Sequence, residues 1–171
     1  MVIILLGLAY AGVSRSIDSI LPGERLNTSV RRLAALLRET RSDAIARNGE
    51  FFIEYDLDNS GMRVVTPFRV GGGTIVENSD EDAWDERFAL PWEFLEPGVE
   101  IETVSLAGNQ FDQGIVRARF DPRGASSDHL VILTQPDFEN HFTIEVLALT
   151  GVIKFHDGIF FREVPDESNF E

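Results

Sequence analysis

The fold of this chain is decided by residues 27–56, which read NTSVRRLAALLRETRSDAIARNGEFFIEYD. In the first two thirds of this stretch, apolar side chains recur at intervals of three and four residues, the period of an amphipathic helix. The apolar stripe consists of Leu26, Val30, Leu33, Leu37 and Ala44, with Leu36 and Ile45 beside it. We expect this stripe to pack on a sheet, with a helix cap at one of residues 27–29 and a stop at Asn48-Gly49.

Arginine is concentrated on both sides of the stripe. Arg31, Arg38 and Arg41 lie on one side, and Arg25, Arg32 and Arg47 lie on the other. Within the helix only Glu39 and Asp43 oppose these charges. Two interpretations stay open: the solvated surface of an ordinary amphipathic helix, or an electrostatic docking face for an acidic partner.

After Gly49 the pattern changes to short strands. Residues 50–55 and 62–66 flank a turn sequence, DNSG, and predict a β-hairpin. Residues 67–98 look irregular because they contain Gly71-Gly72-Gly73, an acidic run and three prolines. Further strands are predicted at 99–106, 115–120, 130–134, 142–147 and 152–156, with a last candidate at 159–163. The expected fold is α+β: a long N-terminal helix packed on an antiparallel β-sheet or a two-sheet β-sandwich.

Composition limits the possible functions. The 171 residues fit one domain, and 43% apolar residues are enough to form a core. The absence of cysteine excludes disulfides, thiol catalysis and thiolate metal sites. The net charge of −14 repels phosphate groups, so a general nucleic-acid binder is disfavoured.

Residues 1–13, MVIILLGLAYAGV, are uncharged. A helix of this length spans ~20 Å, short of the ~30 Å hydrocarbon layer, and a helix continued to Leu21 spans ~31 Å before Pro22-Gly23 breaks or kinks it. A secretory signal peptide, a buried core helix and a membrane anchor that lacks its upstream part are the alternatives. We favour the anchor. The predicted organisation is a truncated hydrophobic anchor at residues 1–24 and a globular domain at residues 25–171.

No group of residues predicts catalysis. The histidines, His129, His141 and His156, lack metal-ligand spacing such as HExxH, although the first and the last each neighbour an aspartate. The glycine cluster lacks phosphate-loop spacing. One acidic run lacks the EF-hand pattern and is best interpreted as a solvated loop, with Ca²⁺ binding as the alternative. Its carboxylates are Glu77, Asp80, Glu81, Asp82, Asp85 and Glu86. We assign no catalytic, cofactor-binding or metal-binding residue, and we expect no cofactor and no enzyme activity.

Three motifs follow in order: RSDAIARNG at 41–49, FDPRG at 120–124 and IEVLALTGVI at 144–153. Together with the apolar N-terminal segment and the amphipathic helix, they resemble the minor pseudopilins of type II secretion (the H type) and the related minor pilins of the FimT kind. The residues in the motif positions are Ser42, Ala44, Ile45, Arg47, Phe120, Pro122, Gly124, Ile144, Val146, Thr150, Gly151 and Ile153. Residues 67–98 fall outside the resemblance, and we expect an acidic insertion there.

Members of this family begin with a basic leader that ends in glycine, followed by Phe-Thr-Leu-Ile-Glu. Nothing of this kind precedes Val2, so we expect Met1 to be an internal methionine of the anchor.

The resemblance implies a structural pilin-like subunit of a type II secretion pseudopilus that acts by assembly. The implied partners are other pseudopilins, through the N-terminal helix, and the bacterial inner membrane, with secreted cargo as a further candidate and no nucleic acid. The implied location is a single-pass inner-membrane protein with its globular domain in the periplasm. The alternatives are a minor pilin of a type IV pilus or DNA-uptake system, and an unrelated membrane-anchored β-domain that binds a ligand.

Overall fold

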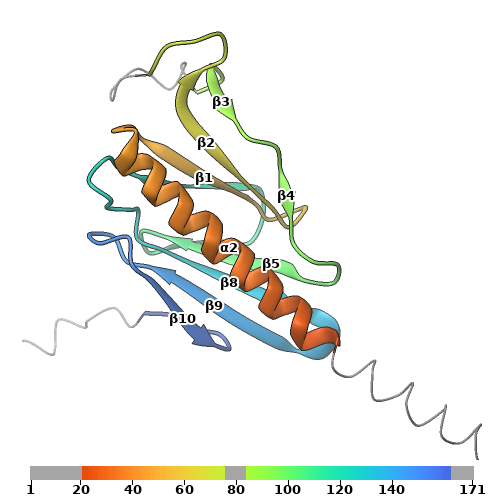
Figure 1. The fold of residues 1–171 in the computed structure, drawn as a ribbon. Coiled ribbons are helices and arrows are strands. Elements are labelled where there is room, and N and C mark those ends of the chain that lie inside the picture. Colours follow the sequence, from red (N-terminus) through yellow and green to blue (C-terminus); the bar gives the residue numbers. More distant parts are fainter. Residues whose placement is uncertain (1–20, 76–83, 163–171) are drawn as a thin grey trace, which may run out of the picture.

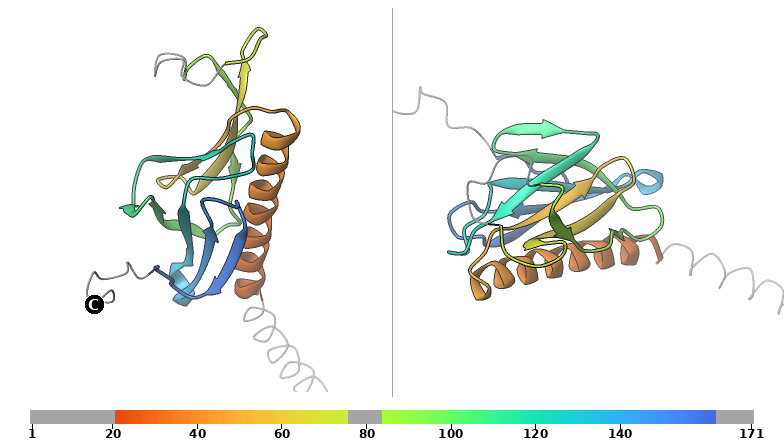
Figure 2. Two further views of the ribbon diagram at one scale, coloured as in Figure 1. Left: turned by 90° about the vertical axis from the view of Figure 1, so that its left-hand side faces the viewer. Right: turned by 90° about the horizontal axis from the view of Figure 1, so that it is seen from above.

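The structure is a computed structural model, and it describes residues 21–75 and 84–162. One long helix, α2 (Leu21–Ala46), lies across two antiparallel sheets, and it runs along one side of both of them (Figures 1 and 2). The predicted α+β class, a helix packed on two sheets, is confirmed.

The first sheet has the order β3-β2-β1-β7, with β4 also paired to β2. Its strands are β1 (Phe51–Asp56), β2 (Gly61–Arg69), β3 (Arg87–Ala89), β4 (Glu93–Phe94) and β7 (Ile115–Phe120).

The second sheet has the order β10-β9-β8-β5-β6. Its strands are β5 (Glu100–Leu106), β6 (Asn109–Phe111), β8 (His129–Gln135), β9 (Asn140–Val146) and β10 (Ile153–Asp157). A short 3₁₀ turn, η2 (Pro136–Phe138), joins β8 to β9.

The predicted apolar stripe of α2 faces the sheets. All five of its residues are buried, and Leu33, Leu37 and Ala44 are completely covered. The opposing surfaces come from both sheets, with Ile53 on β1 and Val131 on β8 equally covered. Each fully buried leucine contributes about 1.5–3 kcal/mol relative to an exposed one. The stripe therefore holds the helix to the two sheets in one core.

The predicted cap of the helix is wrong. The helix extends back to Leu21, so that Pro22 lies in its first turn, where a missing N–H costs nothing. Ser29 instead lies well inside the helix and is buried. Its hydroxyl accepts a hydrogen bond of 3.1 Å from the backbone amide of Glu96, between β4 and β5.

The prediction of an irregular stretch at residues 67–98 is also wrong in part. Strand β2 continues to Arg69, and β3 and β4 pair with it. The sequence did not predict β6 either. The last candidate strand does not form over residues 159–162; the chain there is held by Thr143, whose hydroxyl donates to the Gly158 carbonyl and accepts from the Phe160 amide.

Candidate assembly interface

The arginines of α2 are largely engaged within the molecule. Arg32 donates to the Phe94 carbonyl at 3.1 Å and to the Glu96 carboxylate at 2.9 Å. On the same side, Arg25 reaches the Pro97 carbonyl at 3.4 Å. These arginines therefore fix the loop after β4, which weakens the hypothesis that they form a free docking face.

On the other side of the helix, Arg38 lies over the ring of Phe155, 5.6 Å from its centroid. Arg31 is exposed and makes no hydrogen bond, ion pair or ring contact with another residue in the described part of the chain. Several other residues on the outward face of α2 have short, uncharged side chains, for example Ala35 and Ser42. This face is the part of the helix that stays exposed to solvent.

The three sequence motifs meet at Arg41, near the end of α2. Its Nε donates to the Gly124 carbonyl at 2.9 Å. Both motif glycines have left-handed backbone angles, with φ of 84° at Gly124 and 59° at Gly151. A β-carbon at Gly124 would lie 2.8 Å from Ile45, and one at Gly151 would lie 2.6 Å from both Arg41 Nε and the Gly124 carbonyl oxygen. We call Arg41, Ile45, Gly124 and Gly151 the motif junction; it fixes the two turns against the helix.

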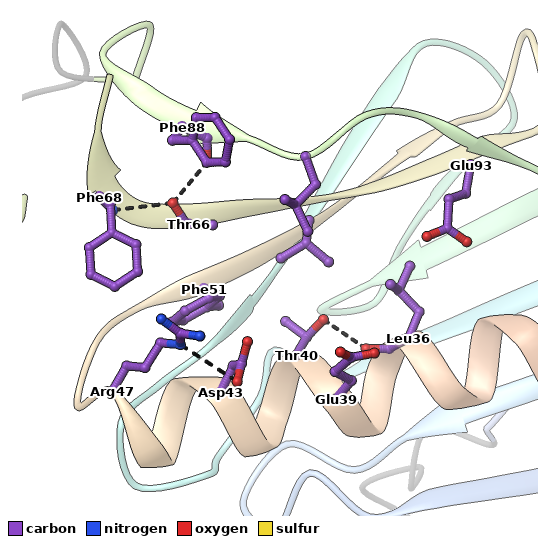
Figure 3. A pocket seen from close by; sticks show the side chains of 12 residues that line it. Leu36, Glu39, Thr40, Asp43, Arg47, Phe51, Thr66, Phe68, Phe88 and Glu93 are labelled. Atoms are coloured by element: carbon purple, nitrogen blue, oxygen red, sulfur yellow. Dashed lines mark hydrogen bonds and ion pairs between the residues drawn. The ribbon is translucent and has the colours of Figure 1, made fainter. Parts of the chain in front are cut away.

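Between α2 and the first sheet lies a groove of about 370 Å³ (Figure 3). Its apolar walls come from the helix, from β1 and β2, and from β3 and the residue after it. These walls are formed by Leu36, Phe51, Val64, Phe68, Phe88 and Leu90. Phe88 and Leu90 are nearly half exposed, so part of the apolar surface is open to solvent.

The charged residues that line the groove are mostly acidic. Glu39 and Asp43 lie on the helix, and Glu93 points from β4 toward it (Figure 3). The one guanidinium in the lining, that of Arg47, lies 3.6 Å from the Asp43 carboxylate. The groove is thus apolar inside with a negative rim, and a partner with an apolar side chain next to Lys or Arg would complement it.

The hydroxyl groups of the groove are already used. Thr40 donates to the Leu36 carbonyl at 2.7 Å, and Thr66 donates to the Phe88 carbonyl at 2.9 Å. Among the described residues that line the groove there is no histidine, serine or cysteine. The arrangement offers surface for binding and contains no paired nucleophile and base.

The three histidines have different partners in the structure. His129 is buried between the sheets, where its Nδ1 donates to the Ser127 carbonyl at 2.8 Å and its Nε2 accepts from the Tyr55 hydroxyl at 3.0 Å. Burial lowers the pKa of His129 from its ordinary 6.5 to about 4, so this ring is neutral and structural.

His141 lies 3.3 Å from the Glu102 carboxylate. His156 stacks on Phe160 and bonds Glu145 at 2.9 Å. Burial acts to raise the pKa of Glu145, but hydrogen bonds from Arg162 and His156 outweigh it and hold that pKa below its usual value. Over residues 21–75 and 84–162, no group of three or more potential ligands could hold a metal ion.

Four of the six carboxylates in the acidic run, Glu77 and those of residues 80–82, lie outside the described residues, so the Ca²⁺ alternative is untested. Glu86 pairs with Arg69 at 3.1 Å. The preceding Gly71-Gly72-Gly73 forms an open turn in which all three φ angles are positive.

In the described part of the chain, no helix is both long and apolar enough to cross a membrane.

Sequence reasoning missed a charged cluster on the outer face of the first sheet, centred on Glu54. A usable signal was present: an acidic residue inside a strongly apolar strand, with arginines at interior positions of the two strands that flank it. Recognising it required the strand order, because β7 is distant in sequence.

Comparisons with known proteins agree with this architecture. The family model described as type II transport protein GspH matches residues 29–150. Two solved structures of the minor pseudopilin EpsH, from the type 2 secretion system of Vibrio cholerae, superpose with TM-scores of 0.53 and 0.54. They share 10% and 12% identity, and the matches cover 78% and 81% of this chain and 97% and 98% of the EpsH chains.

At these identities the EpsH structures show a common fold. None of the curated proteins matches the chain in sequence. The family model, however, spans more than half of the chain, including all of α2 beyond Thr28 and both sheets up to the turn before β10. The chain therefore belongs to the type II transport protein GspH family, and it is a structural subunit of a type II secretion pseudopilus.

Proposed function

We propose that the chain is a non-catalytic, membrane-anchored minor pseudopilin, with residues 1–24 in the inner membrane and residues 25–171 as a periplasmic domain. The observation that carries this proposal is the position of α2. The helix begins at Leu21, a few residues after the uncharged segment of residues 1–13, and its buried stripe fixes it across both sheets. A force or contact that acts on α2 is therefore passed to both sheets.

The assembly contacts of this proposal are the outward face of α2 and the groove beside it. On the outward face of α2, small side chains at Ala35 and Ser42 leave room for another helix between longer charged side chains such as Arg31 and Arg38. The groove has apolar walls and three carboxylates against one guanidinium. We assign to it an apolar side chain of the neighbouring pseudopilin, flanked by Lys or Arg.

A second copy of this chain is a poor occupant of the groove, because two chains of net charge −14 repel each other. A different, more basic pseudopilin satisfies both the apolar walls and the acidic rim. The type IV pilus alternative has no separate support from these contacts, since the family match is to the type II transport protein.

Anchoring is tested by fractionation of two chains, the full sequence and one that begins at Leu21. The start at Leu21 keeps the whole of α2, whereas a start at Leu26 would remove its first turn. We expect the full chain in the membrane fraction and the shortened chain in the soluble fraction. A full chain found wholly in the soluble fraction would contradict the anchor.

The groove is tested in cells whose chromosomal copy carries Glu39→Arg. Glu39 is exposed on the rim, so the change reverses the local charge without touching the core. We expect less substrate protein in the medium and less of the chain cross-linked to other pseudopilins. Glu100→Arg, at an exposed position of β5 outside the groove, is the matched control and should leave both unchanged.

A further inference from the structure

The outer face of the first sheet carries a preorganised charge cluster. Side chains alternate along β1, so Glu54 points away from the core into which Ile53 and Tyr55 are buried. In the strand register, Glu54 lies opposite Arg63 on β2 and Arg117 on β7. One carboxylate is therefore placed between two guanidinium groups.

Contacts to the two arginines use both oxygens of this carboxylate. Arg63 Nε lies 2.6 Å from Oε2, and Arg117 Nε lies 2.7 Å from Oε1. The Glu54 side chain has no exposed surface, whereas those of Arg63 and Arg117 are 28% and 49% exposed. A buried carboxylate is stable only with such partners. Glu54 thus holds two partly exposed cations in fixed positions and compensates the charge of only one.

Each guanidinium also lies over the ring of a tryptophan. The Arg63 Cζ lies 4.3 Å from the Trp92 ring centroid, and the Arg117 Cζ lies 4.4 Å from that of Trp84. Trp84 itself packs edge-on against Phe52, at 4.9 Å between centroids. Glu54 thus lies between two guanidinium groups, and each guanidinium packs on an indole.

Hydrogen-bond donors remain available in this cluster. The terminal nitrogens of Arg63 and Arg117 make no hydrogen bond to any residue of the described chain; only the two Nε atoms are used. Arg87 adds a further cation, with its Cζ 4.9 Å from the Phe52 centroid. Immobilised guanidinium groups bind carboxylates with little further loss of side-chain entropy.

We propose that this face binds an acidic segment of a partner protein, with a carboxylate of that segment received by the terminal nitrogens of Arg63 and Arg117. Tryptophan and arginine are the residue types that dominate binding energy at protein interfaces. A nucleic acid is the less favourable anion, because the net charge of −14 repels a long polyanion more strongly than a short acidic segment. The face lies opposite the side that contains the groove, so the proposal does not depend on the assembly contacts.

The chain itself supplies the spectroscopic signal for a test. It contains two tryptophans, Trp84 and Trp92, and both belong to this cluster. We would titrate the detergent-solubilised full chain with a synthetic peptide of six glutamates flanked by glycines and follow tryptophan fluorescence. The controls are the same peptide with glutamine in place of glutamate, and a single-stranded oligonucleotide of equal length.

We expect the glutamate peptide to bind saturably. The glutamine peptide should bind the unchanged chain at least ~10-fold more weakly, and the glutamate peptide should bind the Arg117→Gln variant at least ~10-fold more weakly, because each change removes a charged hydrogen bond. Arg31→Gln, an equal loss of charge on the helix, should stay within ~2-fold. If Arg117→Gln does not fold, Arg117→Lys keeps the ion pair with Glu54 but loses the planar donor fork, and it should weaken binding several-fold. No fluorescence change at millimolar peptide, unchanged binding by the folded Arg117 variant, or tighter binding of the oligonucleotide would overturn the proposal.

Discussion

Replacing Gly151 by alanine tests the packing of the motif junction. The φ of 59° is left-handed, which costs a non-glycine residue about 1 kcal/mol. The new β-carbon would also lie 2.6 Å from Arg41 Nε and from the Gly124 carbonyl oxygen, closer than real contacts allow. Relief requires breaking the 2.9 Å hydrogen bond between these two groups, which costs about 1.5–3 kcal/mol because the donor is charged.

The expected loss of stability for Gly151→Ala is therefore about 3 kcal/mol, or a fall in melting temperature of about 6–12 °C for a chain of this size. Gly108→Ala is the matched control, since Gly108 has a φ of 86° but nothing within 4 Å of its added β-carbon. This control should lose only about 1 kcal/mol. Thermal melts by circular dichroism of both variants give the difference. Equal losses in the two variants would show that the turn at residue 151 is not packed against Arg41.

Three other predictions concern the core, pH and the acidic run. Leu37→Ala should cost about 2–5 kcal/mol because Leu37 is completely buried, whereas Arg31→Ala should stay within about 0.5 kcal/mol; thermal melts of both variants decide. The pKa of His129 is about 4 in the folded chain and 6.5 ordinarily, so His129 binds a proton more tightly in the unfolded chain. The free energy of unfolding should therefore fall by about 3 kcal/mol as the pH drops from 6.5 to about 4. Urea titrations across this range should show a smaller fall for His129→Gln, and identical profiles would contradict the assignment. Replacing residues 79–83 by a Gly-Ser link should leave the melting temperature nearly unchanged, because closure entropy varies slowly with loop length, but only if Trp84 is kept. A large loss with Trp84 retained would show that the run is structural, and a rise in the melting temperature of the intact chain with millimolar Ca²⁺ would show a metal site there.

The helix and most of the strands could be predicted because their signals are local. The stripe through Leu33 and Leu37 depends only on spacing along one helix, and the β1–β2 hairpin depends on a turn sequence between two apolar runs. The cap failed because the same local rule accepts any of residues 27–29 as a cap, whereas Ser29 forms its hydrogen bond with Glu96 from a distant loop. Strands β3 and β4 were missed because strands of two or three residues have no pattern and exist through pairing with β2.

The candidate sites were less predictable than the fold. The resemblance placed the motif glycines. The physical reason for glycine at positions 124 and 151 is their closeness to Arg41, which lies at least 83 residues away in sequence, so only the folded structure reveals it. Likewise, the carboxylate of Glu54 obtains its two partners from strands 9 and 63 residues away in sequence. Long side chains find their partners through the tertiary fold, so the counts of arginine along the helix overstated what remains free for docking.

The central claim, that this chain is a pseudopilus subunit, is tested most directly by a photo-crosslinking residue at position 35. Ala35 is exposed on the outward face of α2, so the substitution leaves the core intact. After irradiation of intact cells that carry the full-length chain, we expect the crosslinked product to contain another pseudopilin of the type II secretion system. Crosslinks only to type IV pilus subunits, or no crosslink to any pilin-like protein, would contradict the claim.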